Sequence, residues 1–371
     1  MLEKMGEFFD NRIDGYEEHQ LTCIEGAKEF YPFTASLLPS GHLLDLGCGT
    51  GLELEYYFKD NINSKVTCID LAPKMLSKLK DKFSNYDITC ILDDYFKYEF
   101  KDTYNAIVSV ESLHHFEKEK KVSLYKKLYK CLCNDGVFIL TDYFSKDDEE
   151  EKHFYNELKR LKKEQNIQDN EFYHYDTPLT LNHEIEALKE AGFIVEVIKS
   201  WGATSVIKAT KPNRILVIGC PGSGKSTLSR KLKEKTNLPL CHLDMIFWNE
   251  DKTTVDQETF MNRLTKVVES EKWIIDGNFS TTMELRIKEC DTIIFLDFDV
   301  ETCLEGVKSR IGKKRDDIPW IEEQEDEEFM QFIKDFNRCN RPKILELLDK
   351  YQDKNILIFK NREEVNQYFK L

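Results

Sequence analysis

The chain lacks the features that place a protein in or across a membrane. No apolar run in its 371 residues approaches the length that spans a bilayer. Residues 1–4 do not lead into the apolar core of a signal peptide. These absences argue against a membrane-bound or secreted protein, and we expect the protein to be cytoplasmic.

Closely spaced cysteine pairs are also scarce. The 11 cysteines are scattered, only Cys131 and Cys133 lie close together, and no CxxC motif is present to bind zinc or to carry out redox chemistry. We therefore expect buried thiols of a reducing compartment rather than disulfides.

A surplus of positive charge is missing as well. The chain has 53 lysine and arginine residues against 68 aspartate and glutamate residues, which gives a formal net charge of −15. Because phosphate backbones are bound through an excess of basic side chains, this balance argues against nucleic acid as a partner. The 41% apolar and 33% charged residues are typical of a globular protein. We expect small-molecule substrates, and the sequence leaves the oligomeric state open.

Two glycine-rich turns of different pattern are present, and they open at Gly47 and at Gly219. Each follows an apolar run typical of a buried parallel strand and precedes a helical pattern. Unpaired backbone N–H groups and a helix dipole would therefore face one ligand at each turn. A chain of 371 residues also exceeds what one hydrophobic core usually organises. We predict two α/β domains that bind nucleotides, residues 1–211 and residues 212–371.

Apolar runs alternate with helical patterns through both domains, which predicts a doubly wound, mainly parallel sheet in each. For the first, Rossmann-like domain we expect strands at 42–46, 65–70, 88–92, 105–110 and 135–141, and helices near 52–59, 73–83, 118–131, 145–170 and 183–191. Two final strands, 193–199 and 204–209, lie close enough to pair antiparallel. For the second domain we expect strands near 214–219, 240–243, 272–276, 291–297 and 354–359.

Two polar segments bear on how the domains work. Only residues 211–213 separate the last strand of the first domain from the first strand of the second, so we expect a fixed contact rather than a flexible tether. Residues 312–328 are strongly polar. This composition fits either a solvated loop or a lid over phosphates.

The first turn has the spacing GxGxG, formed by Gly47, Gly49 and Gly51. Leu52 stands where a dinucleotide fingerprint has its third glycine, and this difference argues against NAD. The pattern suits a ligand without a pyrophosphate, whose amino acid end approaches the bare backbone.

Acidic residues follow three successive strands at one edge of the predicted sheet. Asp45 heads the glycine turn, where a carboxylate can meet an ammonium group, and Asp70 ends the second strand, where it can accept both ribose hydroxyls. Asp94 follows the third strand, where it suits the exocyclic amine of adenine. The other residues predicted to contact this cofactor are Cys48, Leu71, Asp93, Tyr95 and Val110. A glycine turn alone could be just a tight turn of a doubly wound fold, but the three acids favour a nucleoside ligand.

Residues 15–209 resemble the class I S-adenosylmethionine-dependent methyltransferases. The resemblance includes residues 109–116 after the fourth strand and residues 191–193 before the sixth. It implies S-adenosylmethionine as the cofactor, bound at the glycine turn, Asp70 and Asp94. It also implies that an N-terminal helical region with Phe8, Phe9 and Tyr16 caps the site.

The methyl acceptor is less clear from the sequence. No Asn/Asp-Pro-Pro-Tyr motif follows the fourth strand, which argues against the amino groups of nucleic acids. His114 and His115 could supply a general base, because imidazole titrates near neutrality. Alternatively, the pair only caps and packs a short helix. His174 could also face the acceptor, and methyl transfer, which depends on positioning, does not require a base.

The second turn matches the P-loop pattern GxxxxGK[ST]. In this motif, backbone N–H groups from Gly222 to Ser226 surround a phosphate, Lys225 neutralises developing charge, and Ser226 binds Mg²⁺. The predicted contact residues are Gly219, Pro221, Gly222, Ser223, Gly224, Lys225, Ser226 and Thr227.

Further polar residues extend this second site. Asp276 ends a strand where its carboxylate could hold magnesium, and Asp244 ends another strand on the side of the acceptor. We also expect arginines that screen the transferring phosphoryl group. The candidates are Arg310, Arg315, Arg338 and Arg341. The NKxD motif of GTPases is absent.

Residues 214–371 resemble the adenylate-kinase-like P-loop proteins, and most closely the small bacterial proteins named DNA topology modulation protein. The matching motifs are residues 219–227, 273–278 and 341–343. The resemblance implies an ATP- and Mg²⁺-dependent kinase with the four arginines in or after a lid. Thr281 stands where such sequences tend to carry arginine, so the phosphoryl acceptor stays open. This half is mildly acidic, and the family name therefore does not imply DNA binding.

The sequence predicts a bifunctional cytoplasmic enzyme that methylates a small molecule in its first domain and transfers a phosphoryl group in its second. Two alternatives stay open. The P-loop domain could bind ATP only to regulate the methyltransferase, or the first domain could sense S-adenosylmethionine without transferring its methyl group.

Overall fold

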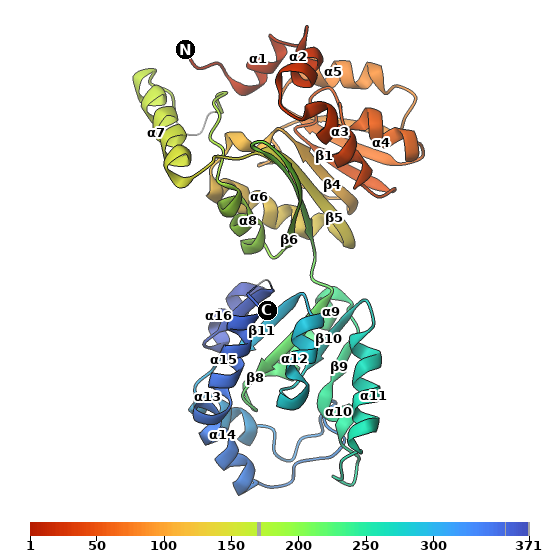
Figure 1. The fold of residues 1–371 in the computed structure, drawn as a ribbon, viewed down its shortest axis with the longest axis vertical. Coiled ribbons are helices and arrows are strands. Elements are labelled where there is room, and N and C mark those ends of the chain that lie inside the picture. Colours follow the sequence, from red (N-terminus) through yellow and green to blue (C-terminus); the bar gives the residue numbers. More distant parts are fainter. Residues whose placement is uncertain (169–171, 353, 370–371) are drawn as a thin grey trace. The chain divides into compact units, whose positions relative to one another are not determined.

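The computed structural model describes residues 1–168, 172–352 and 354–369. The chain divides into two compact units, Met1–Lys211 and Pro212–Leu371. Each unit contains one β-sheet with helices packed on it (Figure 1). None of the helices within the described ranges combines the length and the apolar character needed to cross a bilayer.

The N-terminal sheet has seven strands in the order β3-β2-β1-β4-β5-β7-β6. Their bounds are β1 (His42–Leu46), β2 (Lys65–Asp70), β3 (Ile88–Leu92), β4 (Tyr104–Val110), β5 (Leu132–Tyr143), β6 (Ile194–Trp201) and β7 (Thr204–Thr210). Neighbours from β3 to β5 are parallel, whereas β7 is antiparallel to both β5 and β6, which confirms the predicted antiparallel pair. The strand order reverses between β1 and β4, the place where open α/β sheets bind ligands.

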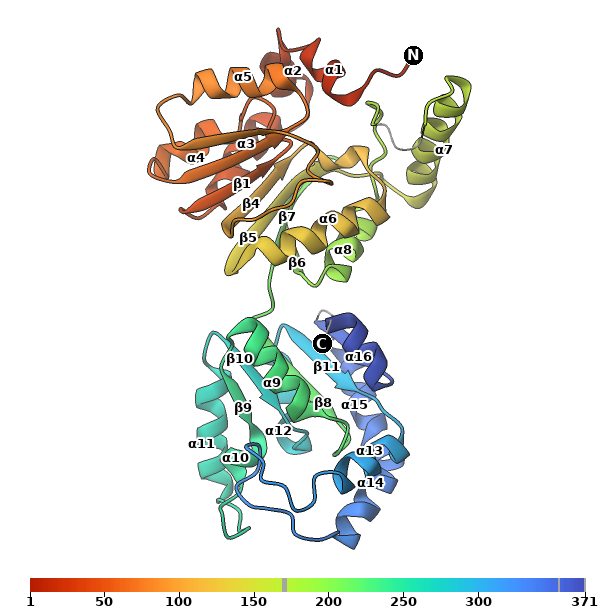
Figure 2. The same cartoon turned by 180° about the vertical axis from the view of Figure 1, so that it is seen from behind.

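Side chains that alternate along the buried strands divide this core between the two faces of the sheet. Leu43 belongs to the cluster packed against α3 (Ala27–Ser36), α4 (Leu54–Asp60) and α5 (Pro73–Lys82). Its neighbour Leu44 belongs to the cluster packed against α6 (Lys118–Cys131) and α8 (Leu181–Glu190), which Figure 2 shows in front of the sheet. The sheet is therefore covered on both faces, as its continuous apolar runs predict.

Shorter helices complete this unit. They are α1 (Met5–Asp10), α2 (Tyr16–Cys23), the 3₁₀ turn η1 (Leu113–His115) and α7 (Asp148–Glu164). The charged helix expected at 145–170 is α7, which is shorter at both ends; residues 169–170 lie outside the described residues. Asp147 caps α7 by accepting a hydrogen bond from the N–H of Glu150, and four acids in the first turn favour the positive end of the helix dipole.

The C-terminal sheet has five parallel strands in the order β12-β11-β8-β10-β9. Their bounds are β8 (Arg214–Gly219), β9 (Leu240–His242), β10 (Trp273–Asp276), β11 (Thr292–Leu296) and β12 (Asn355–Phe359). The central strand β8 leads through the second glycine turn into α9 (Lys225–Thr236). The turn therefore lies at the carboxyl ends of β10 and β11, which flank β8.

The remaining helices of this unit are α10 (Leu243–Phe247), α11 (Gln257–Val268), α12 (Ser280–Glu289), α13 (Val300–Lys308), α14 (Glu327–Cys339), α15 (Arg341–Lys350) and α16 (Arg362–Phe369). The sequence placed Asp244 at the end of a strand, and this placement is wrong. The strand ends at His242, and Asp244 lies in the first turn of α10.

Helices α6 and α8 are joined by ion pairs of very different burial. Lys121 Nζ lies 2.5 Å from Glu184 Oε2, and their side chains are 1% and 0% exposed. The hydroxyl of Tyr125 also donates to Glu184. Lys126 and Glu190 join the same two helices at 3.0 Å, but their side chains are about half exposed. The first pair therefore interacts at low dielectric and the second in water.

We expect Lys121→Met to lower the free energy of unfolding of the N-terminal unit by about 3–5 kcal/mol, because it leaves the buried carboxylate of Glu184 without its cation. Lys126→Met, the matched control on the same helix, should cost less than about 1 kcal/mol. Hydrogen–deuterium exchange of α6 and α8 peptides in urea measures this unit separately. Equal effects of the two substitutions would contradict the assigned difference in burial.

Candidate functional sites

The first glycine turn is bound tightly to the strands beside it. The N–H groups of Gly47 and Cys48 donate to the carbonyl oxygen of Ile69 at 2.9 and 3.4 Å. Gly47 has a φ of +67°, and a Cβ at this position would lie 1.9 Å from Ser112 Oγ. Glycine is therefore required here both by conformation and by space. The turn lies against the segment that follows β4.

Asp45 is a buried acid beneath this turn. Its side chain is fully inaccessible, and no hydrogen-bond donor among the described residues reaches either of its oxygens. The carboxyl of Glu53, also buried, is its acidic neighbour, and burial raises the pKa of both groups. Two buried acids without a cation form a site that favours a positively charged group.

The other two predicted acids, Asp70 and Asp94, accept hydrogen bonds from backbone N–H groups. Asp70 Oδ2 accepts from the N–H of Gly49 at 2.9 Å, and Oδ1 accepts from that of Ala72 at 2.8 Å. Asp94 Oδ1 accepts from the N–H of Phe96, whereas its buried Oδ2 has no hydrogen bond within the described part of the chain. Asp70 thus shapes the turn itself, whereas Asp94 Oδ2 lies 3.4 Å from the ammonium group of Lys97, whose side chain is 75% exposed.

The remaining predicted cofactor contacts lie at the same sheet edge. Tyr95 is buried, and its hydroxyl lies 3.2 Å from Ser112 Oγ, next to the turn. Asp93 Oδ1 accepts from the N–H of Asp94. Cys48 and Val110 are buried, and Leu71 packs partly buried against the core. The fold brings these residues together with Gly49 and Gly51 around the end of β1.

The N-terminal helices cover this region, in agreement with the expected cap. The hydroxyl of Tyr16, at the start of α2, lies 3.4 Å from the place where a Cβ on Gly49 would stand. Burial, followed by the negative charge of Asp70, raises the pKa of this tyrosine. Phe8 in α1 stacks on His174 with ring centroids 3.4 Å apart, and Phe9 packs edge-on against the same imidazole.

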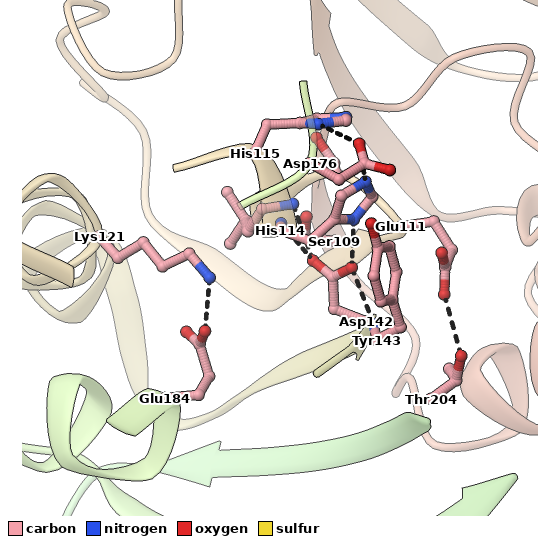
Figure 3. A network of polar contacts seen from close by, with 12 residues as sticks. Ser109, Glu111, His114, His115, Lys121, Asp142, Tyr143, Asp176, Glu184 and Thr204 are labelled. Carbon is pink, nitrogen blue, oxygen red and sulfur yellow. Dashed lines mark hydrogen bonds and ion pairs between the residues drawn. The ribbon is translucent and has the colours of Figure 1, made fainter. Parts of the chain in front are cut away.

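A network of histidines and acids lies just beyond β4 and β5 (Figure 3). Asp142, near the end of β5, accepts from the backbone N–H groups of Leu113 and His114 through Oδ2, at 2.8 and 3.0 Å. Its Oδ1 lies 2.6 Å from Nδ1 of His114. One carboxylate therefore holds both the backbone of η1 and the orientation of the imidazole.

A second carboxylate faces the histidines from the other side. Asp176 Oδ1 lies 3.0 Å from His115 Nδ1, 3.6 Å from His114 Nε2 and 3.9 Å from His174 Nε2. His115 Nδ1 also lies 3.4 Å from the carbonyl oxygen of Tyr175. Three imidazoles from two segments of the chain thus converge on one oxygen.

The two adjacent histidines differ in charge. Burial alone would lower the pKa of His114, but the charge of Asp142 and its hydrogen bond raise it to about 9. Burial and the charge of His114 lower the pKa of His115 to about 4. Burial also raises the pKa of Glu111 to about 8. At neutral pH, His114 is therefore protonated, and only His115 of the pair is free to accept a proton.

The second glycine turn is organised by Lys225 and Asn278. Lys225 Nζ donates to the carbonyl oxygens of Gly219 and Cys220 at 2.9 and 3.1 Å. The side-chain amide of Asn278 both accepts from the N–H of Gly219 and donates to its carbonyl oxygen. A Cβ on Gly222 would lie 2.0 Å from the carbonyl oxygen of Cys303. These contacts hold the turn in one conformation.

The acids predicted for this site lie close to the lysine. Asp276 Oδ1 lies 2.8 Å from His242 Nδ1, and its buried Oδ2 has no hydrogen bond from any described residue. Asp244 is partly buried near Lys225, and burial raises its pKa. Ser226, the predicted magnesium ligand, lies close to Asp317 of the polar segment. The remaining predicted phosphate contacts are Pro221, Ser223, Gly224 and Thr227, which lie in the turn and the first residues of α9.

The four predicted arginines fall into two groups. Arg310 and Arg315 lie near the turn, where they pair with Glu322 at 2.7 and 2.8 Å, and Arg315 also pairs with Asp317. Arg338 is 79% exposed and pairs with Asp335 on its own helix. Arg341 binds both carboxylate oxygens of Asp297, after β11. Among the described residues, only the first two arginines are thus held together with the polar segment, residues 312–328.

A cavity of about 500 Å³ lies between α9 and β9. Its lining includes Arg230, Lys233 and Asn237 from α9 and His242 from β9. The lining also includes the acids Glu234 and Asp316, and Asp316 pairs with Arg230, so the charges of the cavity are mixed. His242 connects the cavity to Asp276.

Comparison with known proteins finds relatives of the N-terminal unit. A family model of methyltransferase domains matches residues 43–136. A carboxy-S-adenosyl-L-methionine synthase of Nautilia profundicola is 24% identical over 229 residues, 56% of this chain and 93% of the relative. A malonyl-[acyl-carrier protein] O-methyltransferase of Bacillus cytotoxicus is 30% identical over 125 residues, 34% of this chain and 42% of the relative. The chain therefore spans less than half of that O-methyltransferase.

The N-terminal unit therefore contains a methyltransferase domain, as the family match over residues 43–136 shows. A solved complex of DhpI with SAH has a TM-score of 0.43 and 12% identity, over 55% of this chain and 94% of that one. Elsewhere in the chain, an adenylate kinase of Encephalitozoon cuniculi is 27% identical over 126 residues, 29% of this chain and 71% of the relative.

Sequence reasoning missed several polar residues of the methyltransferase domain. Asp142 could have been found, because β5 was predicted and its acid lies at the sheet edge already known to hold Asp45 and Asp70. Asp176 gave no such signal, because it belongs to a stretch without helical or strand periodicity. Glu111, with a φ of +50°, lies within the motif at residues 109–116, and the sequence analysis gave it no role of its own.

We expect Asp45→Asn to stabilise the methyltransferase domain in the absence of cofactor. The folded-state pKa of Asp45 is raised, so the wild-type loses stability as pH rises from its unfolded value towards the folded one. The asparagine removes this loss and can donate to Glu53, so the gain should be on the order of 1–2 kcal/mol at about pH 8 and smaller near pH 5. Hydrogen exchange of β1 in urea measures it. Asp102→Asn, at an exposed side chain, serves as the control.

Proposed function

We propose that the methyltransferase domain transfers the methyl group of S-adenosylmethionine to a small-molecule acceptor, and that the C-terminal unit transfers a phosphoryl group from ATP. The observation that carries the first part is Asp45, a buried carboxylate next to a glycine turn and without a donor among the described residues. It fits the ammonium group of the methionine portion. Asp70 and Asp94, at the ends of the next two strands, suit the ribose and adenine.

The histidine network is the place for the acceptor. It follows β4 and β5, next to Ser112 and the glycine turn, and contains groups that can bind or deprotonate a polar atom. His115 is the neutral imidazole and therefore the candidate base, while His114 offers positive charge. One relative is named for methylating oxygen on a carrier-bound malonyl group, and this favours an oxygen acceptor over a nitrogen one.

The kinase proposal is supported by a parallel sheet whose central strand leads into the P-loop turn and α9. The closeness of Lys225 to Asp276, and of Ser226 to Asp317, supports binding of phosphate and Mg²⁺ at this turn. Arg310 and Arg315 are close enough to act on a transferring phosphoryl group after exchanging their acidic partners. The partial match to an adenylate kinase agrees with this assignment.

Incubation of the full chain with labelled S-adenosylmethionine and pooled metabolites tests the methyltransferase. We expect S-adenosylhomocysteine together with a product heavier by one methyl group. Binding of S-adenosylmethionine without any transfer would instead favour a sensor. If calorimetry detected no binding of S-adenosylmethionine, the proposal would fail for this domain.

We expect Lys225→Met to reduce acceptor-dependent ADP formation roughly 100-fold or more, because its ammonium neutralises charge on the phosphates. Lys266→Met, at an exposed position of α11, should leave the rate within about twofold. A coupled assay of ADP with pooled metabolites measures both variants. Slow ADP formation that does not depend on any acceptor would favour a regulatory P-loop unit and contradict a kinase.

A further inference from the structure

Three potential ligand atoms, one of them from Asp176, have the spacing of a metal site. His114, His115 and Asp176 each offer one atom, and these atoms all lie within 4.8 Å of one another. Asp176 Oδ1 lies 3.0 Å from His115 Nδ1 and 3.6 Å from His114 Nε2. When a tetrahedral ion binds at about 2.1 Å, neighbouring ligand atoms lie about 3.4 Å apart. The observed separations bracket this value.

The oxygen Oδ1 of Asp176 lacks a hydrogen-bond donor among the described residues. Asp176 Oδ1 is buried and has no hydrogen bond of acceptable geometry from the described residues, although two imidazole nitrogens lie within 3.6 Å of it. An imidazole N–H that pointed at this oxygen would satisfy it. A cation between the three groups would satisfy all of them at once.

Asp142 supplies the support that metal-binding histidines usually have. It holds His114 Nδ1 at 2.6 Å, so this nitrogen keeps its proton, and a metal ion that displaced the proton of Nε2 would meet a lone pair directed towards Asp176. Histidine ligands of metals almost always donate their other ring N–H to a carboxylate or carbonyl group. Asp142 is itself fixed by two backbone N–H groups, and Figure 3 shows the ring of His114 between the two carboxylates.

We propose that His114, His115 and Asp176 bind a divalent transition-metal ion of the zinc type at the acceptor end of the methyltransferase site. Two imidazole nitrogens argue against Mg²⁺ and Ca²⁺, which prefer oxygen ligands throughout. Three protein ligands leave at least one position open, as in catalytic rather than structural sites. His174 Nε2, 3.9 Å from the shared oxygen, borders this open side.

The consequence for methyl transfer rests on the function proposed above, whereas metal binding itself does not. An acceptor hydroxyl at the open position would lose its proton to solvent or to a nearby base more readily, because the cation stabilises the oxyanion. The oxygen then forms a bond to the methyl carbon. The bond from that carbon to sulfur breaks, and its electron pair stays on sulfur to give S-adenosylhomocysteine.

The test uses tag-free full chain that has been stripped with a chelator, dialysed and titrated with zinc chloride or cobalt chloride. We expect one ion per chain by elemental analysis, and the visible absorption bands of cobalt in a site of low symmetry. His115→Gln and Asp176→Asn should each lower zinc affinity at least tenfold. His153→Gln, at an exposed histidine of α7, should leave it unchanged.

Asp142→Asn tests specifically whether His114 binds the metal through Nε2. Its amide oxygen can still accept from the backbone of η1, but its NH₂ group would donate to His114 Nδ1 and move the proton to Nε2. The metal would lose this ligand, and we expect a 10–100-fold weaker zinc affinity. Should a variant fold poorly, the ring ¹⁵N signals of His114 and His115 in the wild-type protein, followed during zinc addition, decide the matter.

Absence of stoichiometric zinc and cobalt binding, or binding that these substitutions do not affect, would overturn the metal site. Unchanged ring ¹⁵N signals at saturating zinc would do the same. A loaded protein that binds zinc as expected but forms no methylated product would leave the site intact and contradict the function proposed for the domain. The two failures are therefore distinguishable.

Discussion

Buried negative charge at the carboxyl edge of the N-terminal sheet is the constraint on which this domain depends. Parallel strands deliver Asp45, Asp70 and Asp142 to one edge, and each carboxylate needs partners in a region of low dielectric. Asp70 and Asp142 are satisfied by backbone N–H groups and, for Asp142, by an imidazole. The oxygens of Asp45 have no such partner among the described residues. Asp70 and Asp142 therefore shape the site, whereas Asp45 is available to bind a ligand.

The two glycine turns solve the same problem with different partners. The first is held by the carbonyl of Ile69 and the carboxylate of Asp70, so it presents negative charge towards its ligand. The second is held by Asn278 and by the ammonium group of Lys225, so it presents positive charge. This contrast is what the two proposed ligands would need, a sulfonium nucleoside in one unit and a phosphate in the other.

Most of the fold followed from the sequence, because strands buried on both faces are nearly continuous apolar runs. The strand and helix predictions of the methyltransferase domain agree with the structure within a few residues, apart from α7 and the longer β5. The site was less predictable. Asp244 was misplaced because a five-residue helix leaves no periodic signal, and Asp176 comes from an irregular segment. Arg341 pairs with Asp297, which is distant in sequence, and no linear pattern encodes this contact.

The ion pairs between α6 and α8 have a consequence for assembly of the methyltransferase domain. Lys121 and Lys126 lie on one helix, and Glu184 and Glu190 lie on the other. If α8 slid by one turn, the buried ammonium group would face apolar side chains, a penalty far larger than the loss of the surface pair. The buried pair thus specifies the register of the two helices. Since α8 leads directly into β6, that register also determines where the last hairpin joins the sheet.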